Sequence, residues 1–211
     1  MKKRNYPIAE DGWKFFLIPF ILGLLSLFFS KWLFMFFMII SFYCAYFFRN
    51  PIRIVPKDEK LIVAPADGKV LKITEEEHKE MGKVKRIIIF LSIFNVHITK
   101  APIDGKITKI EYFPGKFFNA LNDKSSEENE HNIITIEGKE ITAKVKQIAG
   151  IIARRIVNFK KEGDMVQKGK EIGIIRFGSR VELFLPAEKV EVLTKAGDSI
   201  KGSETIVAKI R

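Results

Sequence analysis

The stretch Lys106–Ile110 reads KITKI, and Lys69–Ile73 reads KVLKI. Both stretches mix polar and apolar residues in a nearly alternating pattern, and in an extended chain every second side chain points to the same face. This alternation is typical of a β-strand that buries one face and exposes the other. Outward from these stretches, short runs rich in β-branched residues recur between Gly, Pro and Asp residues.

Ten such runs predict a mainly β domain over residues 61–211. They are Leu61–Ala64, Lys69–Ile73, Arg86–Leu91, Lys106–Phe113, Asn132–Ile136, Glu140–Gln147, Lys170–Ile175, Arg180–Leu185, Val190–Leu193 and Thr205–Ile210. The segment Glu162–Gly173, EGDMVQKGKEIG, has two glycine turns around a short strand. It is similar to the hairpin of barrel-sandwich domains such as lipoyl carriers. We therefore expect a barrel-sandwich-like β domain.

The first 49 residues differ sharply in composition. Eleven of the 19 Phe residues lie between Phe15 and Phe48, where Lys31 is the only charged residue. The runs Phe15–Phe29 and Trp32–Phe48 are apolar on every side, which does not fit a helix lying on a water-exposed surface. Their lengths are at or slightly below the roughly 17–25 residues that span a bilayer.

These runs predict a transmembrane α-hairpin of two short helices over residues 1–49, with Lys31 at the far interface. One long span would place Lys31 near its middle, at a cost of about 3 kcal/mol. A single tilted span and a half-inserted anchor stay open. Basic residues on both sides of the apolar region predict that both ends face the cytoplasm. Residues 50–60, with two prolines and many charges, are expected to link this anchor to the β domain.

The formal net charge is +11, and most of the basic excess lies in residues 49–211. A basic domain beside an anchor fits an anionic membrane, to which each Lys or Arg near the surface contributes about 1 kcal/mol. Nucleic acid is not an expected partner, because no basic cluster is interleaved with exposed aromatic residues in a known module. The chain shows neither a glycine-rich dinucleotide loop nor a His/Cys cluster with metal spacing. Neither a metal nor pyridoxal phosphate is therefore expected.

Several segments carry a more specific signal together than each does alone. A Gly-Ser pair, a strand histidine and an Asp-Gly turn are each ambiguous. In chain order, however, these segments resemble the phosphatidylserine decarboxylase family of pyruvoyl enzymes over most of residues 50–211. They are RNP at Arg49–Pro51, APADG at Ala64–Gly68, FNVHITKAP at Phe94–Pro102, SEENE at Ser126–Glu130, QIAGIIARRI at Gln147–Ile156 and FGSRVELFLP at Phe177–Pro186. The Gly-Ser-Arg motif is similar to the shorter bacterial and archaeal branch.

The resemblance implies a chain that makes its own cofactor. The Ser179 hydroxyl would attack the carbonyl of Gly178, and the chain would be cut between these residues. The products would be a heterodimer of fragments 1–178 and 179–211, with a pyruvoyl group on residue 179; a higher oligomer stays open. That group would form a Schiff base with phosphatidylserine and accept electrons as carbon dioxide leaves, giving phosphatidylethanolamine. No protein side chain can accept those electrons, which agrees with the need for an electrophilic cofactor.

The resemblance also assigns site residues. His97 is the expected base, because a serine hydroxyl is a weak nucleophile at neutral pH. Asp67 would orient its ring, as the acid does in hydrolase triads. Gly178 lacks a Cβ, so its carbonyl is open to attack. Many longer family members have a second histidine where this chain has Phe94, which leaves open which residue reprotonates the product carbanion, with His97 the first choice.

Arg154, Arg155 and His131 are candidates for contact with the substrate's phosphate or carboxylate. For the two arginines, a solvated basic face is an equally good interpretation. The expected location is the cell membrane, with the catalytic domain on the cytoplasmic face. The alternative is a non-enzymatic, membrane-anchored barrel-sandwich adaptor, which predicts no self-cleavage.

Overall fold

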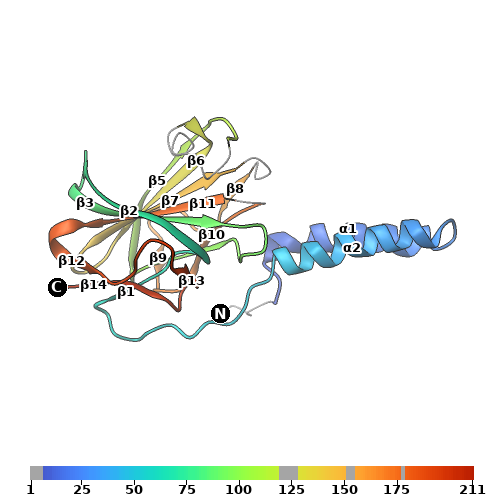
Figure 1. The fold of residues 1–211 in the computed structure, drawn as a ribbon, viewed down its shortest axis with the longest axis horizontal. Coiled ribbons are helices and arrows are strands. Elements are labelled where there is room, and N and C mark those ends of the chain that lie inside the picture. The colour runs from blue at the N-terminus through green and yellow to red at the C-terminus, as the bar shows by residue number, and fades with distance from the viewer. Residues whose placement is uncertain (1–6, 119–127, 151–154, 177–178) are drawn as a thin grey trace. The chain divides into compact units, whose positions relative to one another are not determined.

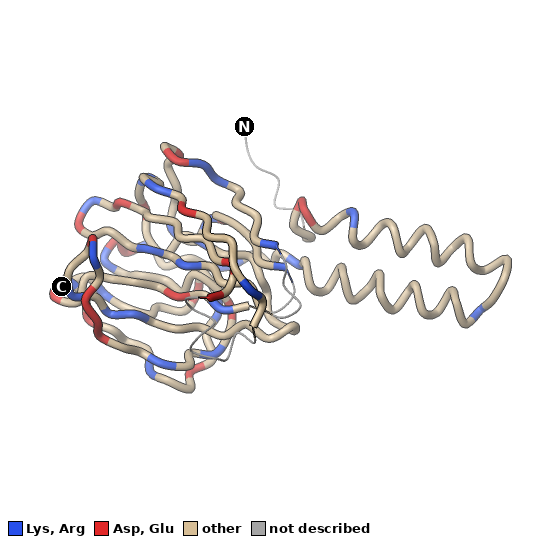
Figure 2. Tube along the Cα trace, turned by 90° about the horizontal axis from the view of Figure 1, so that it is seen from above, with Lys and Arg blue, Asp and Glu red and all other residues tan. Residues whose placement is uncertain are grey.

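The computed structural model describes residues 7–118, 128–150, 155–176 and 179–211 (Figure 1). The chain divides into two compact units, Met1–Ile52 and Arg53–Arg211. Charged residues of both signs are spread over the second unit, whereas the helices of the first carry very few (Figure 2).

The first unit is a helical hairpin. A short 3-10 helix, η1 (Glu10–Gly12), leads into α1 (Trp13–Ser26), and α2 (Lys31–Phe47) returns beside it. The Ser41 hydroxyl donates a hydrogen bond of 2.9 Å to the Phe16 carbonyl oxygen, which joins the two helices. The helices approach each other closely at Gly23, where a Cβ would lie 3.3 Å from the Phe37 Cβ and from the Met38 sulfur.

The predicted pair of helices is confirmed, but the transmembrane hairpin is not supported. α1 has 14 residues and α2 has 17, whereas a span needs about 20. No helix in the described part of the chain is both long enough and apolar enough to cross a bilayer. The apolar run that begins at Phe15 is longer than its helix because its last residues, including Phe28 and Phe29, form the turn between the helices.

The second unit is mainly β, as predicted, and all its strand pairs are antiparallel. A curled sheet has the order β13-β2-β3-β11-β7-β6-β5-β9, and two smaller sheets have the orders β1-β14-β12 and β4-β10-β8. The bounds are β1 Leu61–Val63, β2 Gly68–His78, β3 Gly82–Leu91, β4 Ile98–Lys100, β5 Gly105–Phe113, β6 His131–Glu137, β7 Thr142–Ala149, β8 Ile156–Asn158, β9 Met165–Val166, β10 Glu171–Ile175, β11 Ser179–Pro186, β12 Val190–Val192, β13 Ser199–Ile200 and β14 Ile206–Ile210. A 3-10 helix, η2 (Ala187–Lys189), joins β11 to β12.

The core of this unit lies between the three sheets. Ile62 of β1, Ile172 of β10 and Leu183 of β11 are all fully buried in one cluster, although they belong to different sheets. Each of the ten predicted runs overlaps a strand. The glycine turns in Glu162–Gly173 are also confirmed, since Gly163 and Gly169 have φ of 91° and 76°, in the left-handed region that favours glycine.

Candidate active site

One end of the curled sheet gathers the predicted site residues, and we call it the Ser179 end. Ser179 is the first residue of β11 and is in register with Leu91, the last residue of β3, and with Ala149, the last residue of β7. Because neighbouring strands are antiparallel, β2 and β6 begin at this same end. The strand pairing therefore fixes Ser179 between two continuous strands, in the middle of the sheet.

The side chain of Ser179 is fully buried. Its Oγ has no hydrogen-bond partner among the residues that the structure describes. Buried hydroxyls are nearly always hydrogen-bonded, so one without a partner needs an explanation. A role of this hydroxyl as a reacting group would explain the missing hydrogen bond. Gly178, the predicted partner in cleavage, lies outside the described residues.

His97 directly precedes β4 and is fully buried. Its carbonyl oxygen accepts a hydrogen bond of 3.3 Å from the Ile175 amide, four residues before Ser179. Its ring Nδ1 lies 2.9 Å from the Asn95 carbonyl oxygen. A carbonyl can only accept, so this contact assigns the ring proton to Nδ1 and leaves the lone pair of the neutral ring on Nε2. His97 is thus in the tautomer that can take a proton through Nε2.

Asp67 precedes β2 at the Ser179 end. Its Oδ2 accepts a hydrogen bond of 2.7 Å from Arg53 Nη2, and its Oδ1 accepts one of 2.8 Å from the Gly202 amide. Arg53 also contacts Glu204, at 2.8 Å. β2 lies two strand spacings from β11, roughly 10 Å. The predicted contact of Asp67 with the His97 ring stays a prediction, whereas its attachment to Arg53 is a contact that the sequence analysis missed.

His131 begins β6 and is only 9% exposed. Its Nδ1 lies 2.7 Å from the Asn129 carbonyl oxygen, and its ring stacks on Phe113 with centroids 4.7 Å apart. Burial is the main cause that lowers the pKa of His131, which favours the neutral form of the ring. In the register, His131 is level with Ile148 and Arg180 rather than with Ser179. Alternating side chains therefore place His131 on the opposite face of the sheet from the Ser179 side chain.

Arg155 is exposed, and its carbonyl oxygen accepts a hydrogen bond of 3.2 Å from the Arg176 amide. Arg176 directly follows β10. Arg155 therefore lies beside the segment that leads from β10 to Ser179. Arg154 lies outside the described residues.

A chain of amide and hydroxyl groups, buried at Thr99, Gln147 and Asn132, joins the His97 strand to the large sheet and was not predicted from the sequence. Gln147 Nε2 donates a hydrogen bond of 2.9 Å to Thr99 Oγ1. Asn132 Nδ2 donates to Gln147 Oε1 at 3.0 Å and to Asn158 Oδ1 at 2.9 Å. Thr99 is two residues after His97, and Gln147 is two residues before Ala149, the neighbour of Ser179. These bonds therefore set the position of His97 relative to β11.

A second network, of charged side chains, lies on the other face of β11. The Glu182 carboxylate is fully buried and contacts Arg180 Nε and Arg86 Nη2, each at 2.8 Å. Arg86 also reaches Glu76, at 3.1 Å. A carboxylate shared by two guanidinium groups offsets the desolvation of both. Arg180, directly after Ser179, is thereby held in place.

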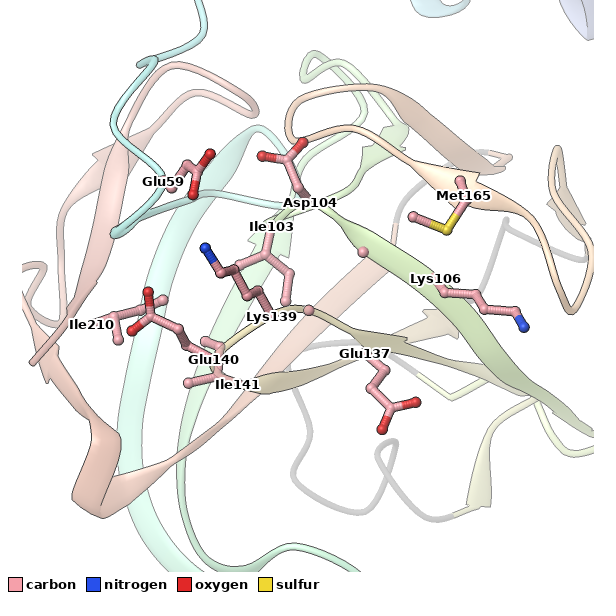
Figure 3. Close-up of a pocket in the computed structure, with 12 residues that line it drawn as sticks. Glu59, Ile103, Asp104, Lys106, Glu137, Lys139, Glu140, Ile141, Met165 and Ile210 are labelled. Atoms are coloured by element: carbon pink, nitrogen blue, oxygen red, sulfur yellow. The ribbon is translucent and has the colours of Figure 1, made fainter.

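The described residues contain no group of three His, Cys, Asp or Glu side chains that could hold a metal. A cavity of about 370 Å³ is lined by Asp104, Glu137, Lys139 and Met165, among others (Figure 3). It lies where β5 begins and β6 ends, which is the opposite end of the sheet from Ser179. This cavity is therefore separate from the residues gathered at the Ser179 end.

Comparison with known proteins gives one consistent result. The family model for phosphatidylserine decarboxylase matches residues 40–208. The phosphatidylserine decarboxylase proenzyme of Syntrophus aciditrophicus is 44% identical, over 96% of this chain and 97% of that protein. The proenzymes of Geotalea uraniireducens and Anaplasma phagocytophilum are 42% and 45% identical, over 98% and 96% of this chain and 98% and 91% of those proteins. The chain therefore belongs to the phosphatidylserine decarboxylase family.

Proposed function

We propose that this chain is a proenzyme that cuts itself between Gly178 and Ser179 and then decarboxylates phosphatidylserine to phosphatidylethanolamine. The observation that carries the proposal is the buried Ser179 hydroxyl, without a partner in the described part of the chain, at the end of the sheet where His97 lies. Family membership supplies the reaction class, and the nearly full-length similarity to proenzymes supports self-processing.

The cut needs no outside reactant except water. Ser179 Oγ forms a bond to the Gly178 carbonyl carbon and the peptide C–N bond breaks, so the amide becomes an ester. Removal of the Cα proton of residue 179 then breaks its Cβ–Oγ bond. Gly178 leaves as a carboxylate that keeps both oxygens, and residue 179 becomes dehydroalanine. Tautomerisation, addition of water and loss of ammonia give the pyruvoyl group.

His97 is the residue that moves protons in this scheme. With Nδ1 held by the Asn95 carbonyl, Nε2 can take the hydroxyl proton and activate the nucleophile. The same ring can later return a proton to the product carbon, and it is our first choice for that step because Phe94 stands where many relatives have a second histidine. Asp67, held by Arg53 and Gly202, supplies a negative charge at this end of the sheet that stabilises the imidazolium.

The surroundings of residue 179 fit a pyruvoyl group. Pairing of β11 with β3 and β7 would hold the backbone of that group from both sides, and full burial would keep water away from it. When present, the group supplies an electrophilic carbonyl that accepts the electron pair released with carbon dioxide. Exposed Arg155 is our candidate for contact with the substrate's phosphate or carboxylate.

We also propose a location at the cell membrane, with the β unit on the cytoplasmic side. The support is the apolar surface of the helical hairpin, where Phe28, Phe29 and Trp32 are 87%, 85% and 70% exposed. A surface of this kind is unusual in water and is expected to be covered by lipid or by another apolar partner.

Mass spectrometry of the purified full chain tests the proposal. We expect fragments 1–178 and 179–211, the second lacking a free amino terminus and lighter by one ammonia than the plain hydrolysis product. Ser179→Ala should stay whole, and phosphatidylethanolamine should form from phosphatidylserine only with the cut protein. An uncut wild-type chain would contradict the proposal and favour a non-enzymatic adaptor.

The base is tested separately. His97→Gln should cut far more slowly than the wild type. His78→Gln is the matched control, because His78 lies at the opposite end of β2 from the site. Normal cutting by His97→Gln would remove His97 from the base role without affecting the assignment of Ser179.

A further inference from the structure

Exposed aromatic side chains gather at the Ser179 end. Phe94, in the loop after β3, is 62% exposed. Phe117 and Phe118, in the segment after β5, are 37% and 41% exposed, and Tyr112 at the end of β5 is 57% exposed. Scattered exposed apolar residues need no explanation, but several large ones at one end of a domain indicate a partner surface.

The strand register shows that these residues flank Ser179. The loop that carries Phe94 follows Leu91, the β3 neighbour of Ser179. On the other side, the Asn129 side chain forms hydrogen bonds of 2.8 Å with both the backbone amide and the carbonyl of Phe118. It also donates a hydrogen bond of 2.7 Å to the carbonyl of Ala149, the β7 neighbour of Ser179. β3 and β6 are three strand spacings apart, roughly 14 Å. The two aromatic segments thus stand on opposite sides of the site.

Basic side chains accompany these aromatic residues. Lys116 is exposed, and its Nζ lies 5.3 Å from the centre of the Phe118 ring, although it also pairs with Glu128 at 3.1 Å. Arg155 is exposed and is among the charged neighbours of the Tyr112 hydroxyl. Aromatic rings favour the headgroup level of a bilayer, and Lys and Arg favour anionic lipid.

We propose that the aromatic rim, defined as Phe94, Phe117 and Phe118 with Lys116 and Arg155, docks on the surface of an anionic lipid bilayer. The inference rests on the proposed function, since a diacyl lipid must bring its headgroup to a buried residue 179 while its chains stay in an apolar phase. Docking of the rim places the Ser179 end against the membrane, so the headgroup needs to move only a short way out of the bilayer. The combination of aromatic and basic side chains favours lipid over an apolar protein partner.

The test uses the full chain in vesicles, with Cys44, its one cysteine, replaced by alanine. Single cysteines at Phe94→Cys or Phe118→Cys carry an environment-sensitive fluorophore, and Met165→Cys is the control. Met165 is 71% exposed and pairs with Lys106, near the opposite end of the sheet. In phosphatidylcholine vesicles that contain anionic phosphatidylglycerol, the fluorescence emission of labels at positions 94 and 118 should shift to shorter wavelength. Nitroxide groups attached to the lipids should quench this emission. Equal quenching at all three positions, or none at 94 and 118, overturns the proposal.

A functional readout separates this inference from the proposed function. Phe117→Ser/Phe118→Ser should cut itself normally by mass spectrometry and turn over a water-soluble short-chain phosphatidylserine at the wild-type rate. Its turnover of phosphatidylserine in vesicles should fall by roughly tenfold, because the rim no longer partitions into the interface. Met165→Ser should behave as wild type in every assay. Failure to cut would count against the proposed function, whereas normal cutting with unchanged vesicle turnover would count against the rim.

Discussion

The Ser179 hydroxyl lies buried at the start of β11, and its burial without a partner in the described part of the chain costs folding free energy. Removing it should therefore stabilise the uncut chain slightly, as expected where a fold keeps a reactive group unsatisfied. Sequence motifs could single out Ser179, His97 and Asp67 as candidates, because each proposed role demands a particular residue type. They could not identify Arg53, whose partners Asp67 and Glu204 lie 14 and 151 residues away along the chain.

The lowered pKa of His131 predicts that the folded chain loses stability in mild acid. Burial lowers its pKa below 6.5 in the folded chain, whereas the unfolded chain regains a value of about 6.5. Above about pH 6.5 the ring is neutral in both states, and its contribution to the stability of the folded chain is complete. As the pH falls toward the folded-state pKa, this contribution is lost, because the unfolded chain binds a proton more readily than the folded one. Urea unfolding of Ser179→Ala at about pH 7.5 and about pH 5.5 measures the loss. Adding His131→Phe to Ser179→Ala should make this loss of stability smaller. An equal loss with and without His131→Phe would show that His131 is not its cause.

The buried position of Glu182 predicts that removing its single carboxylate strongly lowers the stability of the chain. Glu182→Ala leaves the buried Arg180 guanidinium without this carboxylate and removes one of the two carboxylate partners of the half-buried Arg86, which should cost about 3–5 kcal/mol of unfolding free energy. Glu75→Ala is the control, because Glu75 also pairs with two basic residues, Lys83 and Lys85, but on an exposed surface. Its removal should change stability little. Urea unfolding in the Ser179→Ala background gives both values, and similar losses would argue against the burial effect.

At the scale of elements, alternation of polar and apolar residues located the strands but not their full lengths. The expected strand over Lys69–Ile73 extends to His78 because Glu75 and Glu76 pair with basic residues of β3. In this second half of β2, ion pairs to β3 take the place of an alternating apolar pattern. The sequence of one strand does not show such pairs between strands. β4 and β8, of three residues each, lie outside the ten predicted runs.

The hydrogen bond between β4 and β7 predicts a link between packing and self-cleavage. Thr99→Val leaves the Gln147 amide without its Thr99 partner, which should cost about 1–3 kcal/mol and slow the cut by loosening the strand next to His97. Thr135→Val is a matched control, because Thr135 is also buried but its Oγ1 has no partner in the described part of the chain. A time course of fragment formation compares them. Cutting at the same rate in both variants would rule out a positioning role for Thr99.

At the scale of the whole molecule, the proposed cut would divide the sequence but not the fold. β11 pairs on both sides with strands of residues 1–178, and β13 and β14 pair with β2 and β1. Val181, Leu183 and Leu185 of β11 are fully buried, and each such side chain contributes about 1.5–3 kcal/mol. The sheet order therefore supports a tight association of the two proposed fragments, for which the resemblance alone offered no structural reason.

We therefore expect fragment 179–211 to stay bound after the cut and to separate only in denaturant. Size-exclusion chromatography of the processed protein, in detergent and with increasing urea, measures the separation. Leu183→Ala removes buried surface between the fragments and should lower the urea concentration of separation, because such a truncation costs about 2–5 kcal/mol. Glu191→Ala, exposed on β12, should leave it unchanged. Elution of free 179–211 without urea would show that β11 leaves the sheet once Gly178 is released, and that the site must be held together by another contact.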